Sequence, residues 1–293
     1  MNLLKRILLK IDYLLVSHFD DYHFTAHRFK KILGYKPDLD NPKTFNEKVN
    51  WAKLYDRKSR YTLLADKYKS KAYVESLGLK VVPIIGVYDN WDEINFDALP
   101  NEFVIKTNHD SGTMVVCKNK SEFNFNKAKR LITKRLNTDY YKRNREWPYK
   151  DIERKIIIEK YIDSLGKLDS VEYKLTCLNG KVGFVTVCRG IPHHKDTSLR
   201  KNDFYDVDFN LLPFGTNKYF SAKIEYSKPT FWEKMIEQAK KVAEGTIHLR
   251  VDFYVIDNEP VFGEATFFSR GGFVRFVPTE YDKILGEEIK IPM

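Results

Sequence analysis

Apolar residues recur at helical spacing in several stretches of the chain. Over residues 3–15, leucines and isoleucines follow this spacing and cations lie elsewhere on the helical wheel, which predicts an amphipathic helix. Thr44 and Glu47 match the capping box that starts a helix. Further helices are expected over residues 63–77, 127–136 and 229–245.

Short apolar runs bounded by turn residues predict strands. Residues 249–256 and 260–268 flank an Asp257-Asn258 turn signal and predict a hairpin. Asn179-Gly180 predicts another hairpin between residues 171–178 and 183–189. Further strands are expected over residues 81–88 and 155–162, and a strand–turn–strand unit over residues 103–116. Because these strands alternate with helices and pair as hairpins, we expect an α+β protein with antiparallel sheets.

Two polar segments lack an apolar period. Residues 137–151 interleave aromatic and basic side chains, as surfaces that bind nucleic acid do. No strand pattern of a nucleic-acid-binding fold accompanies them, so we expect a solvated loop and no specific nucleic-acid partner. Residues 189–208 are basic and are also expected to form a loop, which could become ordered around a substrate.

Composition restricts the class of protein. The 293 residues allow one large domain or two to three subdomains, and a hydrophobic content of 43% is sufficient for a core. A net charge of +10 suits anionic partners such as nucleotides, acidic sugars, nucleic acid or a membrane surface. The three cysteines Cys117, Cys177 and Cys188 form no C-x-x-C pair, which indicates reduced thiols in a cytoplasmic protein. No apolar stretch reaches the roughly 18 residues of a membrane span.

Two carboxylates interrupt the apolar runs of the C-terminal hairpin. If the turn has three residues, Asp252 lies opposite Glu264 on one face, about 4.5–5.5 Å apart at Cβ. If the turn has two residues, the pairing slips by one and Glu264 points to the other face. Acids this close repel unless a cation lies between them, and Mg²⁺ bound to a nucleotide is the natural cation. A surface hairpin with solvated acids is the alternative.

Several segments in a fixed order resemble one family. They are FVIKTNHDSG, EYKLTCLNGK, RVDFY and FGEATF, with Lys106, Lys174, Arg250, Asp252 and Glu264 within them. Over roughly residues 41–286 the chain resembles the ATP-grasp superfamily, and within it the TupA-like branch associated with teichuronopeptide and other surface-polysaccharide synthesis. The resemblance implies two α+β subdomains whose antiparallel sheets clasp ATP, preceded by a helical segment. The expected division is residues 1–95, 96–162 and 163–293.

The resemblance also implies an ATP site. The expected contacts are Lys67, Lys106 and Lys174 for the phosphates, His109, Ser111 and Gly112 for the lid over them, Glu159, Lys160, Tyr161 and Ile162 for the adenine edge, and Glu172 for the ribose. Asp252, Glu264 and Thr266 would hold Mg²⁺, with Thr266 standing where many relatives have Asn. We therefore expect the register that puts both acids on one face, through a three-residue turn at residues 257–259 or an equivalent bulge.

The implied reaction is ATP- and Mg²⁺-dependent amide formation through an acyl phosphate. Arg250, Arg270 and Lys174 are the expected catalytic cations, and Arg189, His193, His194 and Arg200 the expected contacts for an acidic substrate. The substrates would be an acidic sugar or polysaccharide precursor and an amino acid or amine. A sugar phospho- or glycosyltransferase and a non-catalytic polyanion-binding protein are the alternatives. Residues 1–16 could pack on their own domain or contact the inner face of the membrane.

Overall fold

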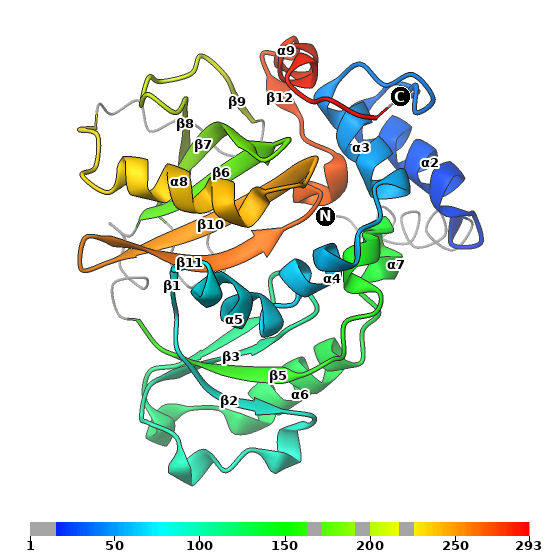
Figure 1. The fold of residues 1–293 in the computed structure, drawn as a ribbon. Helices are drawn as coiled ribbons and strands as arrows, with labels where there is room; N and C mark the ends of the chain where they lie inside the picture. The colour runs from blue at the N-terminus through cyan, green and yellow to red at the C-terminus, as the bar shows by residue number, and fades with distance from the viewer. Residues whose placement is uncertain (1–15, 163–170, 191–199, 217–225, 293) are drawn as a thin grey trace.

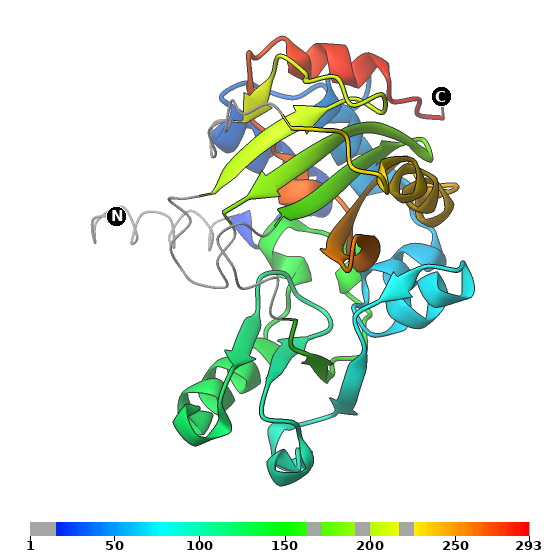
Figure 2. The same ribbon diagram turned by 90° about the vertical axis from the view of Figure 1, so that its left-hand side faces the viewer.

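Two sheets, each with its own hydrophobic core, organise the computed structural model of the chain. It describes residues 16–162, 171–190, 200–216 and 226–292. A six-stranded sheet has the order β1-β11-β10-β6-β7-β8, and a four-stranded sheet has the order β2-β5-β3-β4. Figures 1 and 2 show the larger sheet in the upper half of the molecule and the smaller sheet below it, so that the two sheets form separate layers.

Helices cover both sheets and connect them. The α-helices are α2 (Asp21–Leu33), α3 (Phe45–Tyr55), α4 (Ser59–Ala65), α5 (Lys69–Ser76), α6 (Phe125–Leu136), α7 (Tyr141–Asn144), α8 (Trp232–Ala243) and α9 (Tyr281–Glu287). Helix α8 packs on β6, β7 and β10, and α6 packs on β3. Helices α4 and α5 lie between the two layers (Figure 1).

The strands pair antiparallel throughout, except that β1 runs parallel to β11. They are β1 (Lys80–Val81), β2 (Ile84–Tyr88), β3 (Phe103–Thr107), β4 (Met114–Cys117), β5 (Ile156–Lys160), β6 (Val171–Leu178), β7 (Lys181–Arg189), β8 (Lys201–Tyr205), β9 (Gly215–Thr216), β10 (His248–Ile256), β11 (Glu259–Thr266) and β12 (Phe276–Val277). Strands β9 and β12 form a small sheet of their own. The expected α+β architecture is confirmed. The expected boundary at residue 96 falls between β2 and β3, two strands of the same sheet.

The structure corrects two of the expected elements. The helix predicted over residues 63–77 is two helices, because Asp66 interrupts it. Its Oδ1 accepts hydrogen bonds from the backbone N–H groups of Tyr68 (2.8 Å) and Lys69 (3.3 Å), a local bond that competes with helix continuation. The strand predicted over residues 81–88 is likewise interrupted at Pro83, and its two parts join different sheets.

Both segments expected to be loops contain ordered structure. Residues 137–151 include α7 and a 3-10 turn over Trp147–Tyr149, whose three side chains are buried. Residues 189–208 include β8, the edge strand of the larger sheet. Its Asn202 and Asp203 are buried despite being polar, so the strand carries no apolar alternation from which it could be predicted.

The hairpin of β10 and β11 has a two-residue turn and a bulge. Ile256 pairs with Glu259, and both Asp257 (φ 51°) and Asn258 (φ 58°) adopt the left-handed conformation of a tight hairpin turn. The three-residue turn is therefore wrong. The register then shifts between Asp252 and Phe253, where Gly263 is the additional residue of β11. The bulge brings Glu264 opposite Asp252. The bulge that we expected as the alternative to a three-residue turn is therefore present.

The cysteines are buried and unpaired at all three positions, as expected for reduced thiols. Within the described residues, no helix has the length and apolar character needed to span a bilayer.

Candidate functional site

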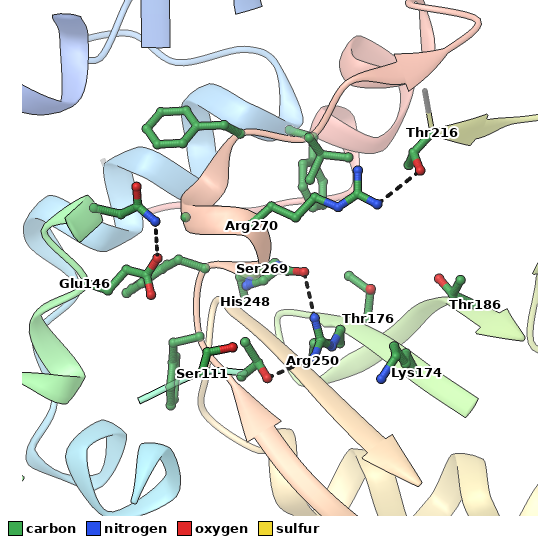
Figure 3. A pocket seen from close by; sticks show the side chains of 18 of the residues that line it. Ser111, Glu146, Lys174, Thr176, Thr186, Thr216, His248, Arg250, Ser269 and Arg270 are labelled. Atoms are coloured by element: carbon green, nitrogen blue, oxygen red, sulfur yellow. Dashed lines mark hydrogen bonds between the residues drawn. The ribbon is translucent and has the colours of Figure 1, made fainter. Parts of the chain in front are cut away.

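A cavity of about 670 Å³ lies against the six-stranded sheet, on the face that α8 does not cover. Segments far apart in the sequence build its wall, among them β6, β8, β10, β11, the turn between β3 and β4, and the segment around α7 (Figure 3). Alternate residues of a strand share one face, which is why Lys174 and Thr176 of β6, and His248 and Arg250 of β10, all reach the cavity. Its charged lining residues are Arg28, Arg143, Glu146, Lys174, Arg200, Arg250, Glu264 and Arg270.

Arg250 binds the two facing acids of the hairpin. Its Nε donates to Oδ1 of Asp252 at 2.6 Å, and its Nη2 donates to Oδ2 at 2.7 Å. The same Nη2 lies 3.3 Å from Oε1 of Glu264 and 3.1 Å from Oγ1 of Thr266. Nη1 donates to Ser269 Oγ at 3.0 Å. The cation between the two carboxylates in this structure is therefore an arginine.

Lys174 adds a second cation to this network. Its Nζ lies 2.6 Å from Oδ2 of Asp252 and 2.8 Å from Oε2 of Glu172. Burial would raise the pKa of Asp252, but the ion pairs with Arg250 and Lys174 outweigh it and lower that pKa. Burial would likewise lower the pKa of Lys174, but Asp252 and Glu172 raise it. Asp252 and Lys174 are consequently charged at neutral pH.

A second pair of cations binds an acid of the four-stranded sheet. Glu159 of β5 accepts from Lys106 of β3 and Lys71 of α5, both at 2.6 Å. The carboxylate is almost fully buried, which would raise its pKa, but the two lysines lower the pKa to about 2. Lys106 lies on the strand that leads into the turn over residues 108–113, the position that the sequence predicted, and its phosphate-binding role stays a prediction.

The turn between β3 and β4 is fixed by its own polar side chains and by Lys67. Asp110 accepts from Thr107 Oγ1 at 2.6 Å and from Thr113 Oγ1, and the Lys67 ammonium donates to the carbonyl of Asp110. The break between α4 and α5 therefore holds Lys67 directly against this turn. Ser111 and Gly112 of the same turn line the cavity, so the turn contributes to its wall.

The comparison with protein families decides the assignment. A family profile described as TupA-like ATPgrasp matches residues 47–290. The chain belongs to the TupA-like ATP-grasp family. The family and the ATP-grasp fold expected from the sequence are both confirmed.

Solved structures of other proteins show weaker similarity to this ATP-grasp chain. The D-alanine–D-alanine ligase from Bacillus anthracis complexed with ATP is 19% identical, with a TM-score of 0.42, covering 70% of this chain and 55% of that one. The D-alanine–D-alanine ligase from Helicobacter pylori is 16% identical, with a TM-score of 0.45 and coverages of 85% and 70%. The L-amino acid ligase from Bacillus licheniformis is 12% identical, with a TM-score of 0.49 and coverages of 91% and 55%. No curated protein matches significantly. At these identities and TM-scores, the family assignment rests on the sequence match.

The residues expected at the adenine edge lie at the end of β5 and directly after it. Lys160 donates its backbone N–H to the carbonyl of Pro83 at 3.0 Å, and the Tyr161 ring is buried beneath the Lys118 ammonium, 5.3 Å from the ring centroid. Ile162 ends the described part of this segment. Glu172, expected at the ribose, is bound to Lys174. The nucleotide roles of all these ATP-grasp residues stay predictions, as do those of His109 and Gly112 in the turn after β3.

The expected substrate residues divide into three groups. Arg200 lines the cavity. Arg270, one of the expected catalytic cations, lines it too, and its Nη2 donates to Thr216 Oγ1 at 3.2 Å. Arg189 instead stacks on the Tyr226 ring, 3.1 Å from its centroid, and is not among the residues of the cavity wall. His193 and His194 lie outside the described residues.

Sequence reasoning missed several residues of the cavity. His248 is 2% exposed, and neither of its ring nitrogens has a hydrogen-bond partner in the described part of the chain. Burial and the nearby Arg250 lower the pKa of His248 to about 3, so the ring is neutral. Its spacing from Arg250 by two residues was the signal that could have placed it on the same face of the strand. Glu146 lies in a segment that we expected to be a solvated loop, and no sequence signal indicated its burial.

The oxygen atoms beside Arg250 are of the type that Mg²⁺ prefers. Asp252 and Glu264 face each other, and Thr266 Oγ1 lies 3.4 Å from Oε1 of Glu264. Two carboxylates and a hydroxyl are a small set, and no cluster of three or more acidic, histidine or cysteine residues suited to a metal occurs in residues 16–162, 171–190, 200–216 and 226–292. The set fits a cation that also receives ligands from nucleotide phosphates.

Proposed function

We propose that this ATP-grasp protein is an ATP- and Mg²⁺-dependent carboxylate–amine ligase. It would join an amino acid or another amine to a uronic acid of a surface polysaccharide or its precursor. The observation that carries the proposal is the meeting of Arg250 and Glu264, from the motifs RVDFY and FGEATF, in one cavity with the turn that follows Lys106. Asp252 binds the same Arg250 through both of its carboxylate oxygens. The polysaccharide part of the proposal comes from the family's association, and the cytoplasm is the proposed location.

The first step is phosphoryl transfer from ATP to the substrate carboxylate. Attack of one anion on another is opposed by charge repulsion, and fixed cations offset it. Lys106 and Lys174 would bind the phosphates, and Arg250 would neutralise charge that builds on the transferring group. Mg²⁺, held by Asp252, Glu264 and Thr266, would supply further charge neutralisation. Arg250 already binds these oxygens, so it would keep them oriented.

The second step is attack of an amine on the acyl phosphate. The N–C bond forms, the C–O bond to phosphate breaks, and phosphate leaves with the electron pair. Negative charge develops on the carbonyl oxygen in between, and Arg270 at the cavity wall would stabilise it. The remaining arginines of the wall, among them Arg200, would bind the acidic part of the substrate.

A substrate screen tests the proposal. Glucuronate and galacturonate would each be combined with the common amino acids, with ATP and Mg²⁺ present, and ADP release and product mass would be measured. The ligase requires both a carboxylate and an amine for ADP release, and the product mass equals the sum of the two minus water. ADP release with a sugar alone, with a phosphorylated product, would instead support a sugar phosphotransferase. Salt-sensitive binding to acidic glycan without ADP release would support a non-catalytic binding protein.

A further inference from the structure

Glu146 is an acid in a cavity whose other charged groups are nearly all cations. It is 4% exposed and lines the cavity together with Glu264. Glu264 lies beside Arg250 and belongs to the proposed metal site. Glu146 lies elsewhere on the wall, and Figure 3 shows it on one side of the cavity with Lys174 on the other. The two acids of the wall therefore have different surroundings.

The segment that carries Glu146 is rigidly held. Arg145 adopts a left-handed conformation (φ 57°) that ends α7, and its side chain donates to the carbonyl of Ser17 at 2.7 Å. Trp147 follows and stacks on the Tyr61 ring, with centroids 5.7 Å apart. Anchors on both sides of Glu146 fix its position in the wall, which a residue that must meet a reacting group requires.

The carboxylate has a neutral partner and no close cation. Asn144 Nδ2 donates to Oε1 at 3.1 Å, and within the described residues no lysine or arginine nitrogen forms an ion pair with Glu146 at 4.0 Å or less. Lys53, the strongest cationic influence on Glu146, donates instead to the carbonyl of Gly271 at 3.0 Å. A buried carboxylate without a close counterion is costly, and an ammonium group in the cavity would supply that counterion.

Glu146 is also connected to the loop that carries Arg270. A Cβ atom added to Gly271 would lie 2.7 Å from Asn144 Nδ2, so the partner of Glu146 packs directly on this loop. Arg270, the proposed binding site for the oxyanion, and Glu146 are thus on two segments that pack against each other. An amine held by Glu146 would lie on the side of the cavity from which it can reach a carbonyl beside Arg270.

We propose that Glu146 binds the ammonium group of the amine substrate and takes a proton from it before the amine attacks. This inference rests on the proposed ligase function. The ammonium gives one proton to the Glu146 carboxylate and becomes a neutral amine with a lone pair. That lone pair forms the N–C bond to the acyl phosphate, phosphate departs, and the second nitrogen proton leaves with the phosphate. The proton on Glu146 then passes to solvent.

The electrostatic environment agrees with this role. Burial raises the pKa of Glu146, with Lys53, Asn144 and Arg143 opposing the increase. A raised pKa makes the carboxylate a better proton acceptor at neutral pH. The titratable or charged groups that influence Glu146, or that lie in the elements around it, are Lys53 of α3, Arg143 of α7, Arg28 of α2, Tyr140 and Tyr149.

Hydroxylamine separates the two steps of the reaction. It is neutral near pH 7 and traps an acyl phosphate as a hydroxamate without needing a base. The assay would use the full chain with ATP, Mg²⁺ and the uronic acid–amino acid pair that the substrate screen identifies. For Glu146→Gln we expect hydroxamate formation within about 2-fold of the wild type and amide formation reduced by about 100-fold or more. The residual amide rate should rise with pH, because solvent then deprotonates the amine.

Control variants distinguish a failure of the Glu146 inference from a failure of the proposed ligase function. Glu153→Gln, the same substitution at an exposed acid nearby, should leave both products unchanged. Glu146→Asp should recover part of the amide rate. Equal loss of hydroxamate and amide in Glu146→Gln would assign the residue to structure or ATP binding and overturn the inference, as would retention of both. Failure of the wild type to form any hydroxamate would instead refute the proposed ligase function itself.

Discussion

Asp252→Asn and Glu264→Gln should have the same effect on catalysis and different effects on stability. Both substitutions remove a carboxylate from the proposed metal site, so each should reduce Mg²⁺-dependent ADP release by at least about 10–100-fold, the loss caused by removing even an outer partner of a metal site. The surroundings of the two carboxylates differ. The side chain of Asp252 is 5% exposed and accepts from Arg250 and Lys174, whereas that of Glu264 is 33% exposed with a 3.3 Å contact to Arg250.

The difference in stability can be stated from these contacts. Removing one partner of a buried ion pair costs about 3–5 kcal/mol, and at about 2–4 °C per kcal/mol the Tm of Asp252→Asn should fall by about 6–20 °C. A partly exposed ion pair contributes about 0–1 kcal/mol, so the Tm of Glu264→Gln should change by no more than about 4 °C.

Thermal unfolding without nucleotide measures the stability effect, and ADP release with the screened substrates measures catalysis. Glu259→Gln is the matched control, because Glu259 lies on the same strand, is 35% exposed and pairs with Lys234 at the surface. It should change neither quantity. If Glu264→Gln retains wild-type ADP release, the metal assignment is wrong. If Asp252→Asn is as stable as Glu264→Gln, the buried ion network does not stabilise the fold as described.

Three other predictions concern the cations around the site. Glu159 has a folded-state pKa of about 2, below its unfolded value, so its ion pairs should stabilise the fold fully above about pH 5 and progressively less as the pH falls toward 2. The difference in unfolding free energy between wild type and Glu159→Gln, measured with urea, should shrink over that interval. A constant difference would contradict the prediction. Lys106→Met should reduce the Tm increase that ATP produces, whereas Lys129→Met, at an exposed lysine of α6, should not. Arg250→Lys should lose most activity because lysine cannot bind Asp252 with two nitrogens, and wild-type turnover would argue against that role.

The hairpin of β10 and β11 shows how far sequence reasoning extends. Apolar runs and the turn signal located both strands, and the need for Asp252 and Glu264 to share a face required either a longer turn or a bulge. The sequence could not choose between them, because a glycine such as the one at position 263 often marks a bulge but does not require one. In the structure, the positive φ angles of Asp257 and Asn258 require the short turn, and the bulge compensates.

The other features that could not be predicted from the sequence share a physical cause. Strand β8 and residues 146–149 carry buried polar and aromatic side chains, of which Asn202, Phe204 and Glu146 line the cavity. These segments therefore lack the apolar period on which a prediction relies. Lys53 and Lys71 belong to helices and look like ordinary surface lysines in the sequence, yet both are buried against groups that only the fold brings near. Long-range partners of this kind cannot be inferred from spacing along one chain.

The central claim is that a substrate carboxylate becomes an acyl phosphate in the cavity. The most direct measurement uses a uronic acid in which both carboxylate oxygens are a heavy isotope, with the amine, ATP and Mg²⁺. One labelled oxygen should appear in each phosphate released, because the C–O bond to the transferred phosphoryl group breaks when the amine attacks. Released phosphate without the label would show that the carboxylate never accepted the phosphoryl group, and would contradict the proposed ligase reaction.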